Sequence, residues 1–166
     1  MKEGIGLKRL PVLLLTLIWI LAGCGAGEPT ALTINRSFCC PVAVEQGGHH
    51  LEAELTVTPE QCAAVFSLPD GMKGMTMTCR NNDVTVMFGE NKSETPLPDA
   101  RQCFLFWLSR ALAQTNAAVI RRENAFALHG AVDENRYLLT VDRATLQPLY
   151  FEMDALDLTV RFQNGQ

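Results

Sequence analysis

The 166-residue sequence predicts an α+β domain in which a curved antiparallel sheet of about nine strands carries one helix on its concave face. Three observations lead to this fold class. Apolar and polar residues alternate with a period of two through most of the chain after residue 34. Short turn signals separate these segments, and one segment alone has helical spacing. An amphipathic sheet and an apolar helix bury their apolar faces by packing as two layers.

The N-terminal residues have the pattern of a targeting segment. Lys2, Lys8 and Arg9 precede an apolar run of about 13 residues from Leu10 to Ala22. A membrane-spanning helix needs about 20 apolar residues, so a permanent span is the less favoured interpretation. The run ends in Leu21-Ala22-Gly23-Cys24, which resembles the lipobox of bacterial lipoproteins. The resemblance implies that a diacylglycerol is attached to the Cys24 thiol and that the chain is cut before it. An ordinary secretory signal that happens to end in cysteine is the alternative.

These residues divide the chain into three parts: a lipoprotein signal peptide at 1–23, a lipidated tether at 24–33 and a domain at 34–166. Two or three acyl chains on one residue hold a protein stably at a membrane. We therefore expect a monomer anchored to the extracytoplasmic face of the cell membrane. Without Lys2, Lys8, Arg9 and Glu3 the net charge of −4 becomes −6, which excludes a nucleic-acid binder driven by phosphate contacts.

Five cysteines remain beyond Cys24, namely Cys39, Cys40, Cys62, Cys79 and Cys103. An odd number cannot form a complete disulfide framework, and no CxxC spacing indicates a zinc site or a redox pair. Neighbouring residues of a strand point to opposite faces, so one of Cys39 and Cys40 is expected to face the core. Most of the five are interpreted as small buried hydrophobes. One disulfide from Cys39 or Cys40 to another strand is the open alternative.

Strands are predicted at residues 51–58, 75–79, 84–88, 126–132, 137–141, 149–153 and 156–162, and with weaker patterns at 38–45 and 61–68. Turn signals such as Gly47-Gly48 and Asn81-Asn82-Asp83 separate them, so the strands are expected to follow one another as an antiparallel meander. A helix is predicted from Pro98 to about Gln114. Asp99 and Gln102 have capping-box spacing, Asn116 is the expected C-cap, and Phe104, Trp107, Leu108 and Ala111 share one face.

Two segments, Ser67 to Gly74 and Gly130 to Phe162, resemble the carrier and receptor superfamily of LolA and LolB type. The resemblance extends to short lipoproteins of Gram-positive bacteria that share the half-barrel fold. It implies an apolar groove on the concave face, suited to an acyl chain, a lipid or a lipidated partner. The inward-facing candidates for its lining are Leu55, Val57, Met75, Met77, Val86, Phe88, Leu139, Phe151 and Phe162, with Phe104 and Trp107 as a lid. A closed core made of the same residues is the alternative.

Motifs for catalysis are absent from the sequence: there is no nucleophile elbow, HExxH, phosphate loop or dinucleotide fingerprint. We therefore expect no enzyme activity and no cofactor. His49 and His50 are interpreted as a solvated hairpin end, and His129 as a structural imidazole. Sulfur donors suit Cu(I), and Met72, Met75, Met77 and Cys79 lie close together, but packing is the favoured role and no metal site is predicted.

The function expected from these observations is that of a membrane-anchored cell-envelope lipoprotein that binds an apolar ligand or a lipidated partner. The alternative is a lipoprotein with a closed core whose outer surface docks other envelope proteins.

Overall fold

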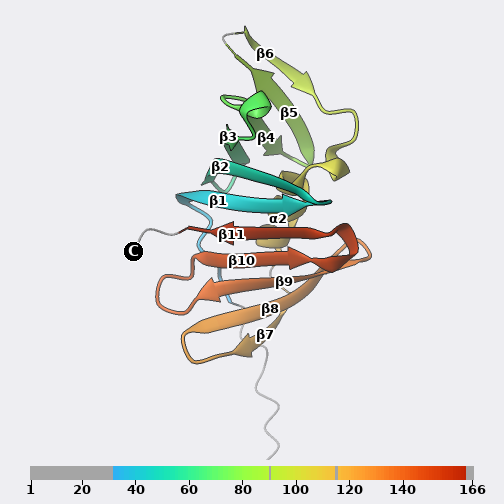
Figure 1. Cartoon of the computed structure of the whole chain (residues 1–166). Helices are drawn as coiled ribbons and strands as arrows, with labels where there is room; N and C mark the ends of the chain where they lie inside the picture. Colours follow the sequence, from blue (N-terminus) through green and yellow to red (C-terminus); the bar gives the residue numbers. More distant parts are fainter. Residues whose placement is uncertain (1–31, 90, 115, 164–166) are drawn as a thin grey trace, which may run out of the picture. The chain divides into compact units, whose positions relative to one another are not determined.

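In the computed structural model, eleven strands form one antiparallel sheet (Figure 1). The structure describes residues 32–89, 91–114 and 116–163, so the predicted signal peptide, the lipobox and Cys24 lie outside the described residues. The strands are β1 Phe38–Gln46, β2 His49–Val57, β3 Cys62–Leu68, β4 Thr76–Arg80, β5 Asp83–Phe88, β6 Asn91–Pro96, β7 Ala118–Arg121, β8 Ala125–Val132, β9 Asn135–Asp142, β10 Pro148–Met153 and β11 Leu158–Phe162. Short 3-10 turns occur at η1 Asp70–Met72, η2 Ala100–Gln102 and η3 Asp154–Leu156.

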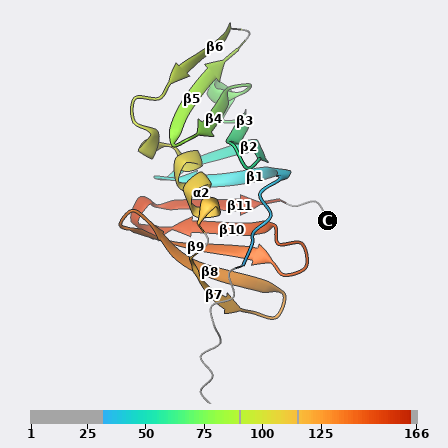
Figure 2. The same cartoon turned by 180° about the vertical axis from the view of Figure 1, so that it is seen from behind.

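The order of strands in the sheet is β6-β5-β4-β3-β2-β1-β11-β10-β9-β8-β7. The sheet therefore consists of two meanders, β1 to β6 and β7 to β11, and consecutive strands pair within each meander. The two meanders join where β1 pairs with β11, with Val42 opposite Phe162 and Val44 opposite Val160. The chain passes from the edge strand β6 to the other edge strand β7 through the segment that contains the helix. This crossover places the helix over the middle of the sheet (Figure 2).

The helix α2, Phe104–Ala113, lies on one face of the sheet and contacts β3, β4, β5 and β8. Its first five residues, Phe104 to Leu108, are all buried. The predicted helix start at Pro98 is wrong. Asp99 accepts a hydrogen bond from the backbone N–H of Arg101 (3.1 Å), but this bond caps the separate turn η2. Cys103 has an extended backbone and separates η2 from α2. The predicted C-cap at Asn116 is also wrong, because α2 ends at Ala113 and Gln114 is its C-cap.

Alternating side chains of the strands face α2 and form the core. In β1 the buried residues are Phe38, Cys40, Val42 and Val44, and in β9 they are Tyr137, Leu139 and Val141. The Tyr137 ring lies over Gly130, its register partner on β8. A Cβ atom at Gly130 would collide with that ring, so the missing side chain makes room for it.

The predicted number of nine strands is too small, because the two edge strands β6 and β7 were missed. Residues 91–96, Asn-Lys-Ser-Glu-Thr-Pro, have no apolar alternation, and β7 has four residues. Each of these segments becomes a strand because a neighbour, β5 or β8, offers it a row of backbone donors and acceptors. A period-two pattern detects strands that have one buried face. An edge strand can form without a buried face, so it can lack this pattern.

The two-residue turns agree with the predicted signals. Gly47 and Gly48 have φ of 56° and 77°, and Asn81 and Asn82 have φ of 52° and 70°, as tight hairpins require.

Among the described cysteines, Cys40, Cys62, Cys79 and Cys103 are buried, Cys39 is exposed, and all five are free. The predicted burial of most cysteines is therefore confirmed. No described helix is long and apolar enough to cross a membrane.

Candidate functional site

The candidate site is a pocket of about 430 Å³ at the end of the β1-β2 hairpin, between the sheet and the start of α2. We call it the hairpin pocket. Its walls are mostly apolar, and it is lined by Gln46, His49, Leu51, Phe66, Met72, Met77, Leu97, Gln102, Cys103 and Phe104. Its volume lies within the range of about 300 to 1,000 Å³ that is common for pockets that bind small ligands.

Three neighbouring strands supply the floor of the hairpin pocket. Leu51 on β2, Phe66 on β3 and Met77 on β4 fall on the face that α2 covers, because each keeps the alternation of the buried residues beside it. Phe104, in the first turn of α2, packs edge-on against Phe66, with 6.3 Å between the ring centroids. The Gln46 side-chain amide donates to the backbone oxygen of Gln102 (3.1 Å), which ties the hairpin to the segment before the helix.

The lining of the hairpin pocket carries no Asp, Glu, Lys or Arg. Cys103 is 5% exposed, and burial raises the pKa of its thiol to about 11. The thiol is therefore protonated and uncharged near neutral pH. While this thiol is protonated, the lining favours an uncharged, largely apolar occupant, because a charged group would lose its water shell without gaining a counter-ion.

Most of the residues predicted to line the groove are buried. Eight of the eleven are 8% exposed or less, namely Leu55, Val57, Met75, Phe104, Trp107, Leu139, Phe151 and Phe162. Met77 and Val86 are partly buried. Phe88, the last residue of β5, is 57% exposed. Of the predicted set, Met77 and Phe104 line the hairpin pocket. Ligand binding at these residues stays a prediction.

The sequence reasoning missed eight residues of the hairpin pocket. Leu51 and Phe66 could have been found, because both keep the period-two pattern of predicted strands. Met72, Leu97 and Cys103 lie in turns or at a helix start, and no local pattern indicates that they meet. Gln46 and His49 come from the end of the β1-β2 hairpin and Gln102 comes from η2, so they meet only through tertiary packing.

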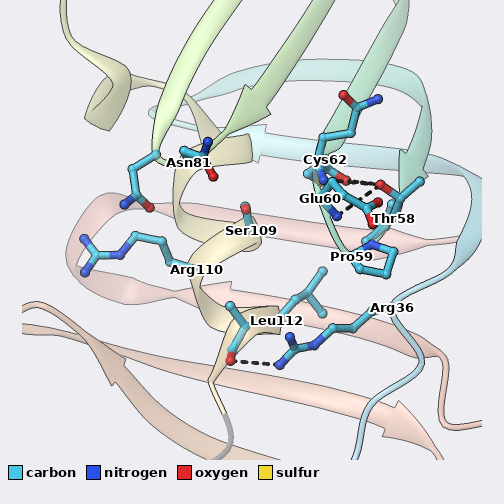
Figure 3. A pocket seen from close by; sticks show the side chains of 13 residues that line it. Arg36, Thr58, Pro59, Glu60, Cys62, Asn81, Ser109, Arg110 and Leu112 are labelled. Carbon is cyan, nitrogen blue, oxygen red and sulfur yellow. Dashed lines mark hydrogen bonds between the residues drawn. The ribbon is translucent and has the colours of Figure 1, made fainter.

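A second pocket, of about 190 Å³, lies beside the C-terminal half of α2, and most of its lining residues are polar (Figure 3). We call it the polar pocket. Its two arginines already have partners. Arg36 donates to the backbone oxygen of Ala113 (2.8 Å), while Arg110 forms an ion pair with Asp133 (2.9 Å) and lies over the Phe106 ring. This pocket is smaller than most ligand sites, so we consider it the weaker candidate.

The described residues contain no group of three or more His, Cys, Asp or Glu side chains that are placed to hold a metal ion. The cluster predicted from Met72, Met75, Met77 and Cys79 is divided in the structure. Met75 and Cys79 are packed in the core, at 8% and 1% exposure, whereas Met72 and Met77 line the hairpin pocket.

No protein-family model matches the chain, and no curated protein matches it. Several solved structures are similar in fold, among them the following two. One is described as the CwlD amidase from Clostridioides difficile in complex with the GerS lipoprotein, with 14% identity, a TM-score of 0.49, and coverage of 100% of this chain and 99% of that chain. The other is a LolA superfamily protein from Nitrosomonas europaea, with 13% identity, a TM-score of 0.38, and coverage of 84% and 76%. The function proposed below rests on the residues of this chain.

Proposed function

We propose that this protein is a non-enzymatic binding module that holds an acyl chain, or a similar apolar segment of a lipidated partner, in the hairpin pocket. The observation that carries the proposal is an uncharged, mostly apolar pocket of about 430 Å³ at the hairpin end of an otherwise closed core. The polar groups Gln46, His49 and Gln102 belong to the same lining. They are suited to contact a polar head group while Leu51, Phe66 and Phe104 contact the chain.

The energy of binding should grow with the length of the apolar chain. Burying one methylene contributes about 0.8 kcal/mol, which is about a fourfold change in the dissociation constant. Fatty acids of 8, 10 and 12 carbons should therefore bind with affinities that rise by more than tenfold for each two carbons. The rise should stop once the chain is longer than the pocket.

Binding can be measured with a dansyl-labelled undecanoic acid. Residues 31–166 form one compact unit, so the chain 25–166 is suitable, and Trp107 is its single tryptophan. Bound probe should accept excitation energy from Trp107, and unlabelled fatty acids should displace it. Met72→Trp places a larger side chain in the pocket lining and should weaken probe binding at least tenfold. Its affinity is read from dansyl emission under direct excitation, so that the added tryptophan does not contribute.

The matched control is Met87→Trp, which makes the same replacement at a partly exposed site on β5 outside the pocket lining. It should leave probe affinity unchanged. Equal affinities of the two variants, or affinity that does not depend on chain length, would contradict the proposal.

We also propose that Cys24 is lipidated and holds the protein at the extracytoplasmic face of the cell membrane. The support is the segment Leu21-Ala22-Gly23-Cys24 after an apolar run. Cys24→Ala should leave the precursor uncleaved or release the protein from the membrane fraction. Normal processing with full membrane retention of Cys24→Ala would refute this.

A docking role for the outer surface is the second candidate. Ile120 is 51% exposed on β7, an edge strand of the sheet that the described residues form, and edge strands are common docking surfaces for another chain. A photoreactive residue at position 120 should then crosslink to one specific envelope protein, whereas the same residue at the exposed turn position Glu134 should not.

A further inference from the structure

Two sulfur atoms from distant parts of the chain meet in the wall of the hairpin pocket. The Sγ atom of Cys103, just before α2, lies 3.6 Å from the Sδ atom of Met77 on β4. Cys103 is buried and Met77 is half-buried, and both side chains line the pocket. A weak hydrogen bond from the thiol to the thioether accounts for the contact when the pocket holds no ion.

Two further potential ligands for copper, a thioether and an imidazole, line the same pocket. Met72 comes from η1, and His49 comes from the start of β2, so the four donors belong to four different segments of the fold. A thiol, two thioethers and an imidazole are donors that soft metal ions prefer. The lining lacks the carboxylates that Mg²⁺ and Ca²⁺ need.

We propose that the hairpin pocket binds one Cu(I) ion through the Cys103 thiolate and the Met77 thioether, with Met72 and His49 as further ligands. The separation of the two sulfurs suits a shared ion. With metal–sulfur distances of about 2.3 Å, the length found for zinc thiolates, a separation of 3.6 Å gives an angle of about 103° at the metal, close to tetrahedral.

Binding requires the exchange of one proton for one metal ion. The S–H bond of Cys103 breaks, its proton leaves to solvent, and the sulfur electron pair forms the bond to Cu(I). Met77, Met72 and His49 each donate a lone pair as neutral ligands. No electron is transferred in this step, so copper must arrive in the reduced state.

This inference goes beyond the proposed binding of an apolar ligand, although both use the wall formed by Met77 and Cys103. The two are separable by experiment. Fatty-acid binding can be measured with a copper chelator present, and copper binding without any fatty acid, so either can fail alone.

The experiment titrates the chain 25–166 carrying Cys39→Ser with Cu(I) under ascorbate, against the chelator bicinchoninate. Removing the exposed Cys39 thiol prevents adventitious binding at the surface. We expect one copper per chain to be withdrawn from the chelator. X-ray absorption at the copper edge should then show sulfur ligands at about 2.3 Å.

Removing a ligand should weaken copper binding strongly. Loss of a residue that merely supports a metal ligand costs about 10- to 100-fold in affinity, so Cys103→Ser should cost at least 100-fold. Met77→Leu should cost at least tenfold and keeps the volume of the wall, so it remains informative if Cys103→Ser fails to fold. Met75→Leu and Cys79→Ser are the controls, because these residues lie in the core and do not line the pocket.

The proposal is overturned if bicinchoninate keeps all the copper. It is also overturned if Met77→Leu and Met75→Leu bind copper equally well, which would indicate adventitious binding only.

Discussion

Phe104 and Phe88 were both predicted to line one groove, but the structure gives them opposite environments. Phe104 is 1% exposed and packs edge-on against Phe66, whereas Phe88 is 57% exposed at the end of β5. Replacing each by alanine removes the same atoms from two different surroundings. The pair therefore tests whether the sheet is closed by α2 as described.

The magnitudes follow from burial. Truncating a fully buried phenylalanine to alanine costs about 3 to 5 kcal/mol, since a cavity remains and the edge-on contact with Phe66 is lost. Phe88 buries less than half of its surface, and full burial contributes about 1.5 to 3 kcal/mol, so its loss costs about 1 kcal/mol. The free energies of unfolding of the two variants should differ by about 2 to 4 kcal/mol.

Urea unfolding followed by Trp107 fluorescence measures this difference. With a slope of about 2 kcal/mol per molar urea, Phe104→Ala should lower the midpoint by about 1.5 to 2.5 M, and Phe88→Ala by about 0.5 M. Phe104→Leu serves in place of the alanine variant if that variant is unfolded without urea. Equal midpoint shifts for positions 104 and 88 would refute the reasoning, because they would mean that the two rings are equally buried.

Three further predictions follow. Gly130→Ala should lower the free energy of unfolding by at least about 1 kcal/mol in the same assay, because its new methyl group displaces the Tyr137 ring; no change would mean that the ring lies elsewhere. In the folded chain 25–166, a thiol reagent should modify Cys39 rapidly and the four buried cysteines after unfolding; rapid reaction of five thiols would contradict their burial. Hydrogen bonds to Glu45 and Glu52 raise the pKa of His50 above 6.5, and NMR titration should show a lower pKa in Glu45→Gln. Because the folded pKa is the higher one, this pairing stabilises the fold below about pH 6.5 and its effect is lost as the pH rises through the folded pKa.

The sequence predicted those parts of the fold that have a local signal. Strands with one buried face alternate visibly, as β2 and β9 do, and the hairpin turns carry glycine or asparagine where φ is positive. The helix was found from its apolar spacing, but its start was placed too early. Asp99 caps the short turn η2, which precedes α2. The sequence alone does not distinguish the cap of a 3-10 turn from the cap of an α-helix.

The candidate site was predicted less well, because its residues share no local pattern. Met77 and Phe104 were named in advance as inward-facing residues. Their neighbours in the pocket include Leu97 from a connection, Met72 from a 3-10 turn and Cys103 from a helix start. These segments meet only after β3 and β4 have paired and α2 has packed across them.

The sequence by itself determined the antiparallel sheet, the single apolar helix and the burial of most cysteines, because each depends on the order of apolar and polar residues along a short segment. The tertiary structure decided which apolar residues close the core and which leave a pocket. That outcome depends on where α2 crosses the sheet. Leu139 and Phe151 are fully buried, Phe88 at the end of β5 stays exposed, and Met77 and Cys103 meet at the start of the helix. The alternation of side chains along a strand decides on which face of the sheet a residue lies. The packing of the helix on the sheet decides what that residue contacts.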